Sequence, residues 1–145
     1  MNFNEFNDLV EKTKTKHPIW FGLEPDKSVN EIAIVNAEKT LKAKFPNEYK
    51  EFILKYGGGY FAFSIIYSLD DVSDWNLVKI NHEYLSLRTG YILISENGVG
   101  DFYGYKIING VCSSEIYFYD HEIESWEKTL FSNLFDYLKK HALTN

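Results

Sequence analysis

The order of the secondary-structure signals predicts an α+β fold with a largely antiparallel central sheet. Helical patterns come first, strand patterns dominate the middle of the chain, and a helical pattern closes it. The 145 residues are the size of one ordinary domain, and they contain no internal repeat and no Pro/Gly/Ser-rich linker. We therefore expect a single domain, residues 1–145, whose sheet is flanked by N-terminal helices and by a closing C-terminal helix.

Two helices are predicted before Pro46. The first ends at the residue before Pro18, because that position disfavours helical backbone. Its apolar face consists of Phe6, Leu9, Val10 and Thr13. Ser28 and Glu31 have the spacing of a capping box, so the second helix is expected to begin there. Its apolar stripe is expected to run as far as Phe45, where Pro46 breaks the helix.

A central helix is predicted from Pro46, since proline is tolerated at the first helical position. The apolar face of this helix consists of Tyr49, Phe52, Ile53 and Tyr56. Gly57-Gly58-Gly59 ends it, because glycine adopts the left-handed cap conformation without steric cost. Residues 60–67 are rich in aromatic and β-branched side chains and predict one strand.

The second half of the chain is predicted to alternate between strands and turns. A helix is expected over 72–87, a buried strand over 91–94 and a loop over 95–101. Strands over 102–108 and 111–120 form a hairpin, because the Asn109-Gly110 pair between them favours a type I′ turn. The closing helix is identified by the spacing of Phe131, Leu134, Phe135 and Leu138.

Charge and composition narrow the classes of function. The net charge is −6, from 21 acidic against 15 basic residues, which argues against direct binding of nucleic acid and suits a basic partner. The single cysteine, Cys112, allows no internal disulfide and fits a reducing compartment. No signal peptide is evident, and no apolar run approaches the ~18 residues of a membrane span. The expected location is the cytoplasm.

No motif in the chain predicts catalysis or a cofactor. Gly98-Val99-Gly100 has the wrong spacing for a dinucleotide fingerprint and precedes a strand, so a turn is the better interpretation. The segment 120–124 packs three carboxylates and His121 into five residues, but no second His/Cys cluster completes a coordination shell. A solvated acidic turn is therefore favoured over a metal site. Cys112 is interpreted as a packing residue rather than a nucleophile.

Tyrosines beside acidic residues are the candidate recognition feature. Tyr103 and Tyr105 share one face of their strand, and Tyr117 and Tyr119 share one face of the next. The candidate contacts for a basic protein partner are Asp101, Tyr103, Tyr105, Asp120, Glu122 and Glu124. The alternative is that half of these rings fill the core face of the sheet.

The helix pair carries a family resemblance. Its residues Ile34-x-x-Ala37-Glu38-x-x-Leu41-x-x-x-Phe45-Pro46-x-x-Tyr49-Lys50-x-Phe52-Ile53-x-x-Tyr56-Gly57-Gly58 resemble the signature of the SUKH superfamily, the Smi/Knr-like proteins. Gly100-Asp101-Phe102-Tyr103 is similar to that family's Gly-Asp strand entry, and Phe131, Phe135 and Leu138 are similar to its closing helix. The resemblance covers roughly residues 28–140 and is nearest to the YobK-type branch of bacterial immunity proteins.

The resemblance implies an α+β protein without catalytic activity that binds another protein. For the YobK-type branch it implies an antitoxin that masks a toxin with an LXG secretion domain and a C-terminal ribonuclease. The superfamily also contains regulators of cell-wall synthesis, so a regulatory or scaffold module stays open as an alternative. A small hydrolase using the acids of 120–124 is the enzymatic alternative, and a homodimer also stays open.

Overall fold

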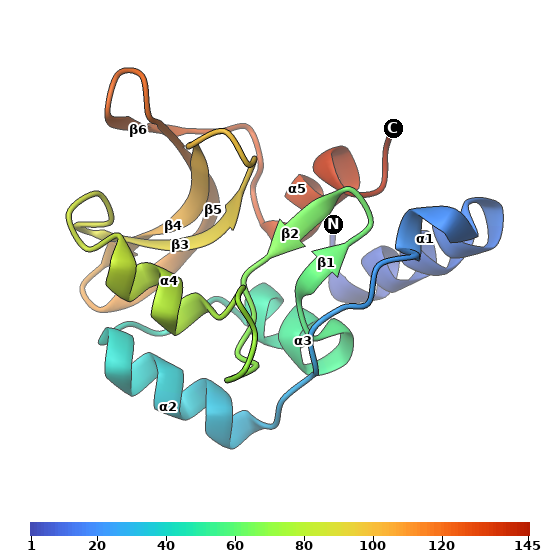
Figure 1. Cartoon of the computed structure of the whole chain (residues 1–145), viewed down its shortest axis with the longest axis horizontal. Helices are drawn as coiled ribbons and strands as arrows, with labels where there is room; N and C mark the ends of the chain where they lie inside the picture. The colour runs from blue at the N-terminus through green and yellow to red at the C-terminus, as the bar shows by residue number, and fades with distance from the viewer.

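The computed structural model describes all residues, 1–145, and contains five α-helices, one short 3-10 helix and one six-stranded sheet (Figure 1). In chain order the elements are α1 (Phe3–Lys16), η1 (Pro18–Phe21), α2 (Glu31–Leu41), α3 (Asn47–Tyr56), β1 (Gly59–Phe61), β2 (Ser64–Ile66), α4 (Leu77–Glu83), β3 (Tyr91–Glu96), β4 (Phe102–Ile108), β5 (Val111–Asp120), β6 (Ser125–Lys128) and α5 (Leu134–His141). Each strand pairs antiparallel with the next one in sequence, so the sheet is a simple meander. The predicted α+β class with a mainly antiparallel sheet is confirmed.

The core lies between one face of the sheet and the helices α1, α3 and α5. Phe6 of α1 is fully buried, and its ring centroid lies 4.7 Å from that of Phe135 in α5. Tyr49 of α3 packs on Tyr105 of β4. On the other side of the molecule α2 packs against α4, which contacts β3. Figure 1 shows α1 at the right, the strands β3 to β5 at the left and the β1–β2 hairpin between them.

The start of α2 differs from the prediction. Asn30 is the N-cap, and its side chain accepts a hydrogen bond from the backbone N–H of Ala33, so the predicted Ser28–Glu31 capping box is wrong. The helix also ends earlier than predicted, at Leu41, because Lys42 adopts a left-handed conformation with φ 57°. Phe45 is still buried, but it lies in the loop between α2 and α3 rather than on a helix.

The segment predicted as one strand over 60–67 is a hairpin. β1 and β2 pair with Phe61 opposite Ser64, and the turn between them places Ala62 at φ 49°. Neither turn residue is Gly, Asn or Asp, so the sequence carried no signal for the turn. The residues are extended as predicted, but the chain reverses direction at Ala62.

The remaining elements were predicted with errors mainly at their ends. α4 is shorter than predicted and begins after the N-cap Asn76, while β3 continues to Glu96. The predicted bounds of β4 and β5 are confirmed, and Asn109 and Gly110 both have positive φ, as a type I′ turn requires. The edge strand β6 was not predicted. None of the helices has the length and apolar character needed to cross a bilayer.

Candidate protein-binding surface

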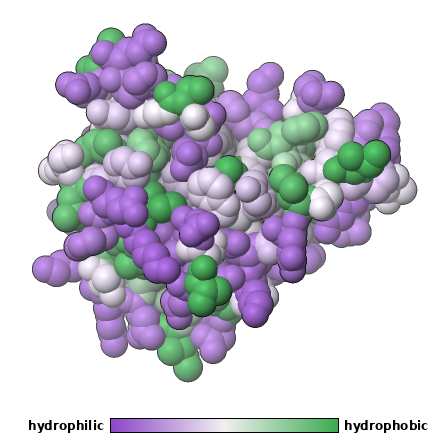
Figure 2. All heavy atoms as spheres, viewed as in Figure 1, coloured by the Kyte–Doolittle hydropathy of each residue, from purple (hydrophilic) through white to green (hydrophobic).

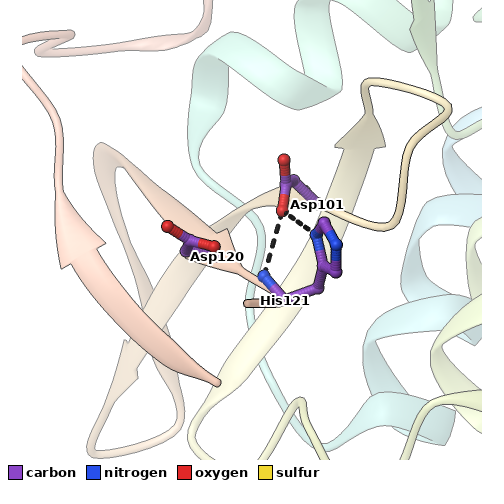
Figure 3. A group of neighbouring side chains, drawn as sticks. All are labelled: Asp101, Asp120 and His121. Atoms are coloured by element: carbon purple, nitrogen blue, oxygen red, sulfur yellow. Dashed lines mark hydrogen bonds and ion pairs between the residues drawn. The ribbon is translucent and has the colours of Figure 1, made fainter. Parts of the chain in front are cut away.

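Two loops at one end of the sheet bring Asp101 and His121 together. Asp101 ends the loop between β3 and β4, and His121 begins the turn between β5 and β6. One carboxylate oxygen of Asp101 accepts two hydrogen bonds from His121, from the backbone N–H at 3.0 Å and from ring Nδ1 at 2.6 Å (Figure 3). The other oxygen accepts a hydrogen bond from the Asn97 side chain at 2.8 Å. These bonds hold the two loops together, and we call the pair Asp101 and His121 the clamp.

The hydrogen bonds between Asp101 and His121 shift the pKa values of both side chains. Hydrogen bonds lower the pKa of Asp101 to about 2, with the backbone N–H of His121 as the largest cause. The bond to Asp101 raises the pKa of His121 above its ordinary value, and the charges of Glu122 and Asp120 add to this effect. Below the raised pKa of His121 the pair is an ion pair, so it holds the loops most firmly when both residues are charged.

A second acid, Asp120, completes a group of three residues with Asp101 and His121. One ligand atom from each residue lies within 4.8 Å of the others. One oxygen of Asp120 accepts a hydrogen bond from the backbone N–H of Glu122 at 2.9 Å, which shapes the turn. Asp101 and the acids of 120–124 were predicted to share one surface, but the contact of Asp101 with His121 was not, because 20 residues separate the two in the sequence. The hydrogen bonds of Asp101 join the two loops, and the hydrogen bond of Asp120 lies within the β5–β6 turn.

Glu122 and Glu124 lie outside that group and are exposed. Glu124 has φ 52° and turns the chain into β6. Figure 1 shows this turn projecting at the upper left, and Figure 2 shows that the projection is mostly hydrophilic. We call Asp101, Asp120, Glu122 and Glu124 the acidic loop pair. The structure brings these four predicted residues to the same end of the sheet.

The two predicted tyrosines lie on the helix-covered face of β4. Tyr103 is half-buried, with its ring centroid 4.8 Å from that of Tyr137 in α5. Tyr105 is fully buried beneath Tyr49 of α3. The two rings do share one face, as predicted, but it is the core face. Tyr105 is therefore wrong as a contact residue, because its side chain has no surface to offer a partner.

A second group of partly exposed aromatic residues lies on the opposite face of the sheet. Tyr91 of β3 stacks on Trp126 of β6, with ring centroids 4.2 Å apart and an interplanar angle of 6°, and Tyr117 of β5 packs against Tyr91. We call these three residues the aromatic face. Gly104 lies beneath it, and a Cβ at this position would lie 3.1 Å from the Trp126 ring. Tyr117 was predicted to lie on a face of its strand, but its neighbours Tyr91 and Trp126 were not, because β6 was not predicted.

The free cysteine has no role in this surface. Cys112 is buried in β5, and burial raises its pKa to about 12, so the thiol is protonated at neutral pH. This agrees with its interpretation as a packing residue.

Comparison with known proteins finds one family and one fold. The profile of the SMI1-KNR4 cell-wall family, within the SUKH group, matches residues 31–138. No curated protein matches the chain. One similar solved structure is the crystal structure of a protein from Pseudomonas syringae pv. tomato, with a TM-score of 0.70 and 16% sequence identity. The alignment covers 94% of this chain and 98% of that one, so the two share a fold over nearly their whole length.

Proposed function

The chain belongs to the SMI1-KNR4 cell-wall family of the SUKH group, and from this premise we propose that it is an immunity protein of the YobK-type branch. It binds a cognate protein toxin in the cytoplasm and neutralises it without catalysing a reaction. The toxin is of the LXG type, with a C-terminal ribonuclease domain whose active site the protein masks.

The observation that carries this proposal is the acidic loop pair. A ribonuclease holds RNA phosphates with a cluster of cationic side chains. Carboxylates on an inhibitor can take the place of those phosphates, and their charge also speeds association. Glu122 and Glu124 are exposed at the projecting turn, and the net charge of −6 has the same sign. Two residues of the aromatic face, Tyr117 of β5 and Trp126 of β6, lie on the strands that carry this turn and add apolar contact area.

The clamp between the loops suits tight binding. Asp101 fixes the start of the β5–β6 turn through both the backbone and the side chain of His121. A turn that is already ordered loses less conformational entropy on association than a free one. The backbone that carries these acids is therefore ordered before association, which suits a masking inhibitor.

The test begins with coexpression of this chain and the product of the adjacent gene. We expect cell survival and copurification of the two proteins. Calorimetry with the purified nuclease domain then compares the wild type with the double variant Glu122→Gln/Glu124→Gln. We expect the variant to bind at least ~10-fold more weakly, with a smaller salt dependence, because two interfacial charges are lost. The matched control is Asp8→Asn/Glu11→Gln, which removes two exposed charges from α1 and leaves affinity unchanged.

Survival without copurification, or equal loss of affinity in the test and control variants, would contradict the proposal.

A regulatory or scaffold module of the Smi/Knr type is the second candidate, and the cell-wall description of the family favours it. Copurification of a partner that has no nuclease activity would support this second function over the first.

A further inference from the structure

A groove runs between α2 and α4, away from the acidic loop pair. It consists of two adjoining hollows of about 330 and 240 Å³. Thr40 of α2 and Val78 and Lys79 of α4 line both hollows, so the two are continuous. Figure 1 shows α2 and α4 side by side at the lower left of the molecule.

One end of the groove is cationic although the chain as a whole is acidic. Lys79, His82 and Arg88 line the smaller hollow, and no carboxylate does. Arg88 is half-buried and forms no salt bridge within the chain. Its Nε donates to the carbonyl of Asn81 at 2.9 Å and one terminal nitrogen donates to the carbonyl of Tyr91 at 3.4 Å. The second terminal nitrogen has no hydrogen-bond partner in the chain and is accessible to solvent.

The other end of the groove has mixed walls. Four apolar residues line the larger hollow, Ala33, Ala37, Leu69 and Val78, together with the polar residues Asn36, Thr40, Asn76, Asp71 and Lys79. Asp71 is the one acid there, and its backbone carbonyl accepts a hydrogen bond from Lys79 at 2.6 Å. The two ends of the groove therefore differ: Arg88 and His82 lie only at the smaller hollow, whereas most of the apolar side chains line the larger one.

We propose that this groove binds a small organic carboxylate with an aliphatic body. The carboxylate lies at the guanidinium of Arg88, which is held in place by two backbone carbonyls and presents free N–H donors. The aliphatic body lies along Val78 and Ala37. A pocket of this size that combines apolar walls with a few convergent polar groups is typical of small-molecule sites. The inference does not depend on the proposed toxin-binding function.

The experiment is a titration of the full chain followed by 1H–15N NMR. Hexanoate is the probe, acetate lacks the aliphatic body and hexanol lacks the charge. We expect saturable shifts at the amides of Thr40, Val78 and Lys79 with hexanoate, and at least ~10-fold weaker binding of each truncated probe, since each lacks one of the two contacts. An acidic peptide is tested in parallel, because a glutamate side chain presents the same carboxylate.

Arg88→Gln is expected to weaken hexanoate binding by ~10-fold or more, because it removes the charge that contacts the carboxylate. Lys79→Gln is expected to weaken it less, because the Lys79 ammonium bonds the Asp71 carbonyl in the larger hollow and attracts the carboxylate only through its charge. Lys140→Gln on α5 is the matched control and leaves binding unchanged. Lys79 is exposed, so its variant keeps the test valid if Arg88→Gln does not fold. Absence of saturable shifts, equal binding of hexanol, unchanged binding by Lys79→Gln, or binding of the peptide alone would each overturn the inference.

Discussion

The buried carboxylate of Glu38 accepts a hydrogen bond from the backbone N–H of Phe45, with 2.8 Å between Oε2 and N. The same oxygen lies 3.6 Å from Nζ of Lys50. Glu38 thus joins the last turn of α2 to the loop and to the first turns of α3. This contact gives a structural reason for the Ala37-Glu38 and Pro46 to Lys50 parts of the family signature.

Replacing Glu38 by Ala leaves the Phe45 N–H without its acceptor inside the protein. We expect Glu38→Ala to lower the free energy of unfolding by ~1.5–3 kcal/mol, the range for a hydrogen bond to a charged group. Urea denaturation measures the change. Lys39→Ala, at the exposed neighbouring position of α2, is the control and is expected to change stability little. Equal effects of the two substitutions would contradict this role of Glu38.

Two buried tyrosines that pack on each other differ in one hydrogen bond. The hydroxyl of Tyr49 donates to the carbonyl of Tyr67 at 2.8 Å, whereas the hydroxyl of Tyr105 is buried without a partner. We expect Tyr49→Phe to cost ~1–2 kcal/mol, and Tyr105→Phe to be neutral or stabilising because it removes an unsatisfied group. Thermal unfolding of the two variants compares them, and destabilisation by Tyr105→Phe would show that its hydroxyl has a partner.

The clamp between Asp101 and His121 predicts a pH window. The pKa of Asp101 is lowered from 3.8 to about 2, so its contribution to stability is present above pH 3.8 and is lost as pH falls toward 2. The pKa of His121 is raised above 6.5, so its contribution is present below pH 6.5 and is lost as pH rises through the folded-state pKa. The clamp is therefore complete between these limits.

NMR titration of the His121 ring checks this window. In Asp101→Asn the pKa of His121 is expected to fall back toward 6.5, because its largest stabilising contact loses its charge. Glu122→Gln is the matched comparison and is expected to lower the pKa of His121 less, since Glu122 acts only through its charge. An unchanged pKa of His121 in Asp101→Asn would show that the clamp is absent in solution.

The glycine that ends α3 is required for two reasons. Gly57 has φ 82°, and a Cβ there would collide with the backbone carbonyl of Asp26. Gly90 has φ 79° but has no atom within 4 Å of such a Cβ. We expect Gly90→Ala to cost ~1–2 kcal/mol from backbone strain alone, and Gly57→Ala to cost clearly more or to abolish folding. Soluble yield and denaturant midpoints distinguish the two, and similar values would contradict the close approach of Asp26.

Leu134 and Leu130 form a matched pair near the closing helix. Leu134, at the start of α5, is completely buried, whereas the Leu130 side chain is fully exposed. Leu134→Ala is expected to cost ~2–5 kcal/mol because it leaves a cavity in the core. Leu130→Ala is expected to stay within ~0.5 kcal/mol of the wild type. A small effect of Leu134→Ala in urea denaturation would show that α5 is not part of the core.

Much of the fold could be predicted because its signals are local. The bounds of β4 and β5 follow from a strand pattern on each side of Asn109-Gly110, and α3 follows from Pro46, an apolar face and a glycine stop. The prediction failed where the local signal was weak or misleading. The turn at Ala62 has no turn residue, and Asn30 rather than Ser28 caps α2.

The fold class, the acidic character of the 120–124 turn and the family resemblance follow from the order of residues alone, because each depends on composition or on spacing along the chain. The contact of Asp101 with His121, the burial of Tyr105 and the stacking of Trp126 on Tyr91 depend on how distant segments pack together. Strand alternation shows which side chains share a face of β4, but it does not show which face the helices cover. That choice depends on how α3 and α5 pack on the sheet, which is a relation between distant segments.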